Sequence, residues 1–285
     1  MSSREAVLAG MWYPGTERGC RLKIEQLMGD EAPAAAGIGG IVPHAGWEYS
    51  GALAIKVYRA IAAADPELLI LFGTHMAPGS APHISRATGF ETPLGTIAAD
   101  TDLAARIAEA LELDTDPADS SWRSDGDNTI EVQLPMIKHF MPDTRLVVIA
   151  PPFGSRAVEI GSVAAREAKG PGVRLAVVGS TDLTHYGPRF GFAPKGRGEA
   201  AARWVREEND ARVIRRMLDL DPEGVLEEAA RNHNACVPGA VAAAIAAARE
   251  LGATSATLLD YRTSYDLQPG DTFVGYAAVV MRVVG

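Results

Sequence analysis

Short apolar runs rich in β-branched residues alternate with alanine-rich stretches along most of this chain. A continuous apolar run bounded by turn residues is typical of a strand that is buried on both faces of a sheet. Each run is short enough for a strand. The predicted strands lie at 37–43, 67–73, 144–153, the start of 174–187, 254–263 and 271–284.

The stretches between these runs carry apolar residues at helical spacing. Ser50 is a suitable N-cap for a helix over 50–64. A helix over 127–140 opens with polar capping residues, and Pro135 must sit early in it or kink it. Further helices are predicted at about 101–112, at 156–168, as an amphipathic pair within 197–231, and at 237–252 just after Cys236. Residues 82–99 are expected to be irregular and to contain a hairpin.

Buried strands separated by helices predict one α/β domain over residues 1–285, with a central mixed sheet covered by helices on both faces. The sequence shows no linker, low-complexity tract or internal repeat that would divide it. In open α/β sheets, ligands bind in the crevice beyond the carboxyl ends of the strands. A functional site is therefore expected at that edge.

Composition limits the classes of partner. The 27 Lys and Arg residues against 36 Asp and Glu residues give a net charge of −9. The sequence has no cluster of basic residues that could bind along the phosphate backbone of a nucleic acid, so a nucleic-acid partner is not expected. No apolar run reaches membrane-spanning length, and the first residues lack the pattern of a signal peptide. Cys20 and Cys236 do not form a disulfide framework, so we expect a reducing, cytoplasmic location without membrane contact.

Polar residues that carry chemistry collect at the predicted strand ends. His44 follows the first strand, His75 follows the second, and Asp182 and His185 follow the strand that begins at 174. Imidazole, thiolate and carboxylate groups that converge at one edge are ligands for zinc, iron or copper. Three other residues join this set from helix starts, namely Cys236, Glu131 and Asn128.

Each of these residues also has an ordinary structural interpretation. A histidine in a loop is often only hydrogen-bonded, and a buried cysteine is often a small apolar side chain. Three histidines at separate strand ends, and a cysteine before a helix N-terminus that favours its thiolate, favour a metal site. Trp47 and Tyr49 would wall the pocket or belong to the core, and His233 lies close enough to Cys236 to support it. A hydrolase using Ser180, His185 and Asp182 stays open, although no G-x-S-x-G motif is present.

The order and spacing of several segments resemble the Memo family, also called protein B of the AmmeMemoRadiSam system. The segments are AGMWYPG, VPHAGWEYSG, GTHM, DNTIEVQLPM, GSTDLTHYG, NACVPGAVAAAI and FVGYAAVV. The resemblance implies a fold like that of the LigB-like class III extradiol dioxygenases. It also implies that His44, His75 and Cys236 are metal ligands, that Asp182 and His185 face the metal, and that Glu131 is a pocket carboxylate.

The function implied is a non-haem, metal-dependent oxidoreductase of dioxygenase type that acts on a small molecule, with His185 as acid/base. Iron or copper is the expected metal, and zinc is the alternative. Asn128 stands where the family commonly has histidine, and the turn before His75 is one residue shorter than in the family. Because Asn128 cannot titrate, the alternative is a metal-binding or peptide-binding protein whose dioxygenase-like pocket no longer turns over.

Overall fold

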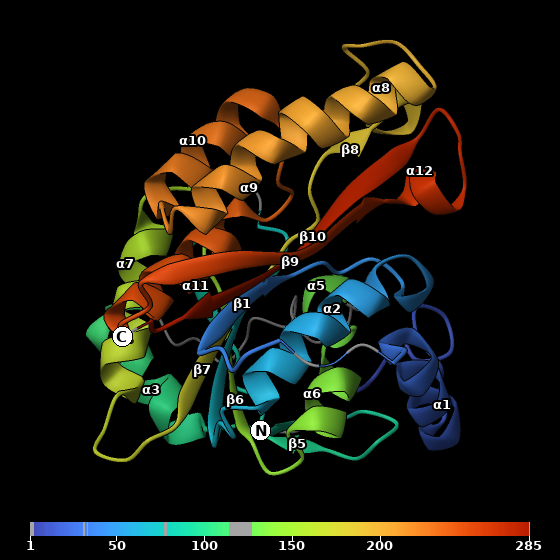
Figure 1. Ribbon diagram of the computed structural model, residues 1–285. Helices are drawn as coiled ribbons and strands as arrows, with labels where there is room; N and C mark the ends of the chain where they lie inside the picture. Colours follow the sequence, from blue (N-terminus) through green and yellow to red (C-terminus); the bar gives the residue numbers. More distant parts are fainter. Residues whose placement is uncertain (1–2, 31, 33, 77–78, 114–126, 285) are drawn as a thin grey trace.

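A twisted sheet runs through the centre of the computed structural model, which describes residues 3–284 except 31, 33, 77–78 and 114–126 (Figure 1). The order of its main strands is β3 (His83–Ile84), β6 (Arg145–Ala150), β2 (Leu68–Phe72), β7 (Leu175–Ser180), β1 (Gly39–Val42), β10 (Phe273–Arg282) and β8 (His185–Tyr186). One further strand, β9 (Ser255–Thr263), pairs with β10 outside this order.

The four inner strands β6, β2, β7 and β1 are parallel, whereas β3, β10, β9 and β8 are antiparallel to their neighbours. The predicted mixed sheet is therefore confirmed. Because the inner strands run in one direction, their carboxyl ends share one edge. The loops that leave this edge carry His44 after β1, His75 after β2 and Asp182 after β7.

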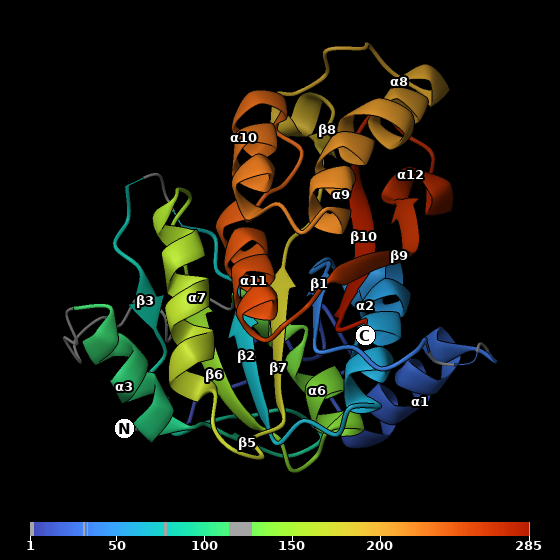
Figure 2. The ribbon, with the colours of Figure 1, turned by 60° about the vertical axis from the view of Figure 1, so that its left-hand side comes forward.

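Both faces of the sheet are covered, which explains why the strands read as unbroken apolar runs. In β2, Ile70 and Phe72 belong to one hydrophobic cluster, and Leu69 and Leu71 belong to the cluster on the other face. Figure 2 shows helices on the two sides of the sheet. The first cluster contains residues of α3 (Thr101–Ala110), α7 (Arg156–Ala168) and α11 (Pro238–Glu250), and the second those of α1 (Glu17–Met28), α2 (Trp47–Ala62) and α6 (Leu134–Phe140).

The alanine-rich helix α11 lies unusually close to the sheet. An added Cβ at Gly179 of β7 would lie 2.6 Å from the Ala240 carbonyl oxygen. Only small residues at the contact permit this approach of helix and strand. The start of α11, and with it Cys236, is thereby held beside the loop that leaves β7, where the Cys236 amide donates to Asp182 O.

The prediction that Ser50 caps a helix is wrong. Helix α2 begins earlier, at Trp47, with Gly46 as its N-cap. The free amide of Trp47 donates to the carbonyl of Trp12, 2.9 Å away, so a distant main-chain group satisfies the helix end. The Ser50 hydroxyl lies inside the helix and donates to Ala45 O.

The predicted helix over 127–140 is two helices. The first is α5 (Asn128–Glu131), and Pro135 lies in the first turn of the second, α6. A proline has no amide hydrogen and is tolerated only at that place in a helix. The hairpin expected within 82–99 is present, formed by β4 (Gly89–Phe90) and β5 (Ile97–Ala98).

The predicted helix pair within 197–231 contains a π-helical turn. α8 (Glu199–Trp204) continues through η2 (Val205–Asn209) into α9 (Asp210–Leu218), and α10 (Pro222–Asn232) follows. Several short elements have no counterpart in the prediction, among them β8, η1 (Pro188–Phe190) and α12 (Ser264–Leu267). Among the described residues, the structure contains no helix with the length and apolar character needed to cross a membrane.

Candidate metal centre

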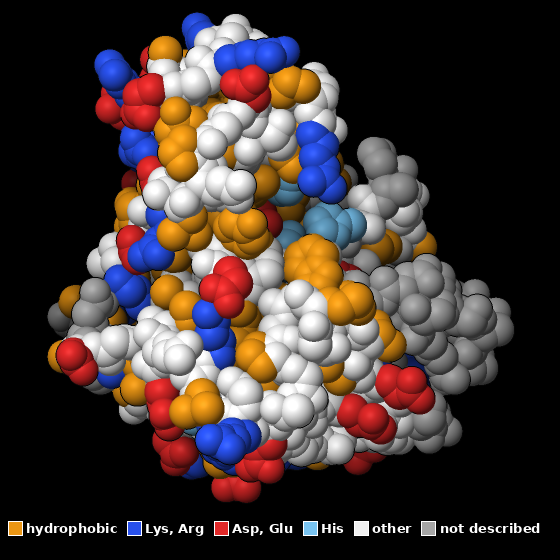
Figure 3. Space-filling model, turned by 90° about the vertical axis from the view of Figure 1, so that its right-hand side faces the viewer, with side chains coloured by type: hydrophobic (Ala, Val, Ile, Leu, Met, Phe, Trp, Pro, Cys, Tyr) orange, Lys and Arg blue, Asp and Glu red, His pale blue; other side chains and the backbone are white. Residues whose placement is uncertain are grey.

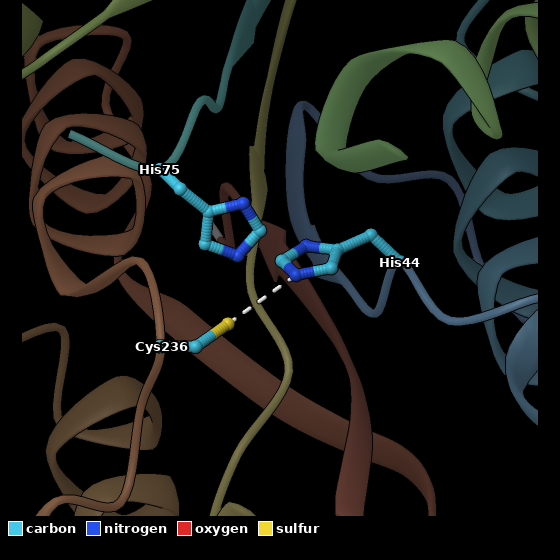
Figure 4. A group of neighbouring side chains, drawn as sticks. All are labelled: His44, His75 and Cys236. Atoms are coloured by element: carbon cyan, nitrogen blue, oxygen red, sulfur yellow. Dashed lines mark hydrogen bonds between the residues drawn. The ribbon is translucent and has the colours of Figure 1, made fainter. Parts of the chain in front are cut away.

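Three side chains from distant parts of the chain meet at the carboxyl edge of the sheet. One ligand atom from each of His44, His75 and Cys236 lies within 4.8 Å of the other two. Figure 4 shows the two rings and the sulfur pointing toward one another. His44 Nε2 lies 3.3 Å from Cys236 Sγ, and the two imidazole centroids are 5.1 Å apart. Ligand atoms sharing one zinc ion at about 2.0–2.3 Å lie roughly 3.3–3.8 Å apart, so small side-chain movements would suffice.

The surroundings of His44 keep its imidazole ring buried and neutral. The side chain is only 1% exposed, and its Nδ1 lies 3.0 Å from the Ser180 hydroxyl oxygen. Burial lowers the pKa of His44 well below its ordinary value, electrostatic interaction with His75 and His185 lowers it further, and Asp127 opposes them. The ring is therefore neutral. In the tautomer in which Nδ1–H donates to Ser180, Nε2 presents its lone pair toward Cys236.

The helix N-terminus after Cys236 was expected to favour its thiolate, but the surroundings of the sulfur favour the protonated thiol. Its sulfur accepts a hydrogen bond from the Asp182 amide at 3.2 Å, which favours the anion. Burial nevertheless raises the pKa of the Cys236 thiol, and the negative charge of Asp182 raises it further. The thiol is therefore protonated in the metal-free protein, so a bound cation would have to displace that proton.

Asp182 lies directly beside the three donors. Its Oδ1 accepts the His44 amide hydrogen at 2.7 Å, and its Oδ2 is 3.9 Å from His44 Nε2. Burial raises the pKa of Asp182 to about 6, although hydrogen bonds from the amides of His44 and Ala45 and the charges of His185 and His75 lower it. The carboxylate fixes the loop that presents His44.

His185, in β8, lies close enough to His44 and Asp182 to interact with them electrostatically. Its Nδ1 lies 3.1 Å from Leu183 O, and its ring meets the Phe190 ring edge-on at 4.8 Å. With Nδ1–H donating to that carbonyl, Nε2 stays free to accept a proton. Figure 3 shows histidine side chains in a hollow of the surface, with hydrophobic and basic side chains around it.

Glu131 and Trp47 both contact the N-terminal segment of the chain. Glu131 is fully buried, and its Oε1 accepts from the Leu8 amide at 2.6 Å and from the Tyr13 hydroxyl at 3.0 Å. The indole N–H of Trp47 donates to Val132 O, and its ring packs against Tyr13. Both side chains hold the segment around residues 8–13 against α5 and the residues that follow it.

The other three residues predicted for the pocket have different surroundings. Asn128 donates from Nδ2 to the His44 carbonyl at 3.0 Å and so supports the His44 loop. Tyr49 is 40% exposed and lies at the start of α2. His233 ends α10 in a left-handed conformation, and its ring contacts Phe192.

A buried polar network at η2 and α9 was not foreseen from the sequence. Asp210 Oδ1 accepts from the Thr184 amide at 3.0 Å, and Asp210 Oδ2 accepts from the Tyr261 hydroxyl at 2.8 Å. Asn209 donates to the Thr184 hydroxyl and receives a hydrogen bond on its carbonyl from the Asn234 side chain. The π-helical turn thus connects the loop of Asp182 with the segment that precedes Cys236, and π-turns are frequent at functional sites.

Asp210 should make stability depend on pH. Burial raises its pKa to about 6, against hydrogen bonds from Thr184 and Tyr261 that lower it. The unfolded chain, with an aspartate pKa of about 3.9, holds this proton less tightly. The folded state is therefore penalised as pH rises from about 4 to about 6, by roughly 3 kcal/mol in total.

Asp210→Asn removes this titration while keeping an acceptor for Thr184. The free energy of unfolding of the wild type, measured relative to Asp210→Asn by urea denaturation, is expected to fall by about 2 kcal/mol between pH 4 and pH 7. An equal difference at both pH values would show that the buried carboxyl does not titrate in this range.

The chain is similar to known proteins over nearly its whole length. The family described as Memo-like protein matches residues 4–280. The chain is 35% identical to a MEMO1 family protein of Pyrococcus furiosus, over 98% of this chain and 99% of that protein. It is 34% identical to a MEMO1 family protein of Methanosarcina acetivorans, over 99% and 100%, and 32% identical to one of Thermococcus kodakarensis, over 98% and 99%.

Proposed function

This chain belongs to the Memo-like family, and on that premise we propose that it binds a metal ion through His44, His75 and Cys236. One observation carries the proposal. Donor atoms from residues 44, 75 and 236, which lie in three separate loops, are all within 4.8 Å of one another. Such convergence of two imidazoles and a sulfur is typical of a metal centre with room for a further ligand.

The donor set indicates which ions fit. A sulfur ligand beside two imidazoles favours iron, copper(I) or zinc over magnesium, and we propose iron or copper, with zinc as the alternative. The neutral ring of His44 needs no deprotonation before binding, whereas Cys236 does. A redox metal held here would supply electron transfer with dioxygen, and zinc would supply Lewis-acid chemistry. His75 is exposed, which leaves one side of the centre accessible.

The proposed activity is that of a metal-dependent oxidoreductase of dioxygenase type acting on a small molecule. His185 keeps Nδ1 on Leu183 O, so its Nε2 is placed to take a proton from a bound hydroxyl group and return it. Phe190 packs against this ring and fixes its plane. Asp182 holds the amide of His44 and keeps that ligand loop in place.

A second candidate is a metal-binding or peptide-binding protein without turnover. It is favoured by Asn128, whose amide is engaged with the His44 carbonyl and cannot exchange a proton with a substrate. A serine hydrolase receives no such support. The Ser180 hydroxyl is paired with His44 rather than His185, and His185 Nδ1 lies on the Leu183 carbonyl rather than on Asp182.

Oxygen uptake separates the two candidates. Protein loaded anaerobically with Fe(II) or Cu(I) is mixed with oxygen and a panel of catechols, and oxygen consumption is followed with substrate loss. Coupled consumption that is abolished by His44→Ala supports the oxidoreductase. If the metal-loaded wild type consumes no more oxygen than His44→Ala, the result supports the binding protein without turnover. If the wild type takes up no metal, the result contradicts the proposed metal centre.

A further inference from the structure

Thr74, the residue immediately before His75, has a strained backbone. Its φ is +76°, in the left-handed region that β-branched residues rarely adopt. Such a conformation is energetically unfavourable and persists only where neighbouring groups enforce it. The strain lies at the point where the chain turns to present His75 to His44 and Cys236.

The enforcing group is the hydroxyl of Thr129, in α5. The Thr74 amide donates to Thr129 Oγ1 at 2.7 Å. That hydroxyl donates its own hydrogen to Asp127 Oδ1, also at 2.7 Å, and the same carboxylate oxygen accepts the Thr129 amide at 2.9 Å. Because the single hydroxyl proton is used by Asp127, the oxygen faces Thr74 as an acceptor in a fixed direction.

The turn has no space in which to relax toward α5. A Cβ added to Gly73 would lie 2.4 Å from Ile130 Cδ1 and 2.7 Å from Thr129 Oγ1. On the sheet side, the Gly73 amide donates to Ile149 O at 3.1 Å. The end of β2 is therefore fixed between β6 and α5, and the Thr129 hydroxyl sets the direction of the next residue.

The same short helix supports the other histidine loop. Asn128, beside Thr129, donates to the His44 carbonyl at 3.0 Å. Helix α5 thus contacts the loops of both imidazole donors through adjacent side chains. Thr129 is itself fully buried, so solvent cannot replace its hydroxyl in this role.

We propose that Thr129 is a positioning residue of the metal centre, whose hydroxyl holds Thr74 in the left-handed conformation and thereby aims His75 at His44 and Cys236. The expected effect of Thr129 on metal affinity rests on the proposed function, whereas its effect on the backbone conformation of Thr74 does not. The two parts can be measured separately.

The test compares Thr129→Val, which keeps the shape and removes the hydroxyl, with Thr129→Ser, which keeps the hydroxyl. Thr144→Val is the matched control, because the buried Thr144 hydroxyl donates to Pro66 O at the opposite end of the sheet. The first readout is the NMR chemical shifts of Thr74 Cα and Cβ in metal-free protein, which report its backbone conformation. The second is the Kd for Co(II), measured by absorption titration.

In Thr129→Val the Thr74 shifts are expected to leave the left-handed range, and the Co(II) Kd is expected to rise about 10–100-fold, as for other residues that orient a ligand. Thr129→Ser should keep the wild-type shifts and a Kd within about threefold. Thr144→Val should lose stability without a change in Kd. Adding Thr74→Gly to Thr129→Val should recover part of the affinity, because glycine adopts positive φ without support.

Unchanged Thr74 shifts in Thr129→Val overturn the inference, whether or not metal binds. Altered shifts with an unchanged Kd overturn it as well, because His75 would then not depend on the turn. If wild type binds no Co(II), the proposed function fails, and the metal-free shifts still decide the role of Thr129. Thr129→Ala, which adds no volume, replaces the valine variant if that variant does not fold.

Discussion

Cys236→Ala is expected to weaken Co(II) binding by at least about 1,000-fold, since it removes the one donor that becomes anionic. Without the sulfur, two neutral imidazoles would remain to hold a dication. The sulfur also fills the gap beside His44 Nε2, 3.3 Å away, so its loss leaves that side of the centre without a ligand. No other substitution in the centre should have a larger effect on affinity.

The measurement is an absorption titration with Co(II), in which a thiolate ligand gives a charge-transfer band in the near ultraviolet. Cys20→Ser is the matched control, because Cys20 is buried in α1 with its thiol donating to Pro14 O. That variant should keep both the band and the wild-type Kd. A Cys236→Ala protein that retained the band would mean that its source is a different thiol.

Gly161→Ala is expected to lower the free energy of unfolding by about 3 kcal/mol, the upper range for overpacking in a core. Gly161 lies in α7 where this helix crosses α11, and an added Cβ would be 2.0 Å from the Ala243 carbonyl oxygen. Because the obstacle is main chain rather than a flexible side chain, the two helices must separate. Helix α11 begins just after Cys236, so the proposed metal centre should loosen with it.

Urea denaturation checks this prediction, with Gly270→Ala as the control. Gly270 has no atom within 4 Å of an added Cβ and no positive φ, so its substitution should change stability by less than about 0.5 kcal/mol. Equal denaturation midpoints for Gly161→Ala and Gly270→Ala would show that the contact between α7 and α11 is looser than described.

The features predicted correctly from sequence are those that depend on local pattern. Strands buried on both faces must be apolar at every position, so runs such as 67–73 are visible without a structure. Parallel strands place their carboxyl ends at one edge, so His44 and His75 could be expected to meet. Cys236 was placed with them by the family resemblance and by its position before a helix.

The features missed depend on contacts between distant residues. Thr184 and Tyr261 are 26 and 51 positions away from Asp210, and no local pattern connects them. The predicted N-cap of α2 was wrong for the same reason, because the Trp47 amide donates to the carbonyl of the distant Trp12. The pocket role of Glu131 came from the family resemblance and stays a prediction, but its hydrogen bonds to Leu8 and Tyr13, 123 and 118 positions away, could not be read from the sequence.

X-ray absorption spectroscopy of the zinc-loaded protein tests the shared centre most directly. The wild type is expected to show one sulfur scatterer at about 2.3 Å together with nitrogen scatterers at about 2.0–2.1 Å, and the sulfur should be absent in Cys236→Ala. A wild-type spectrum with only nitrogen and oxygen neighbours would contradict a centre formed by His44, His75 and Cys236.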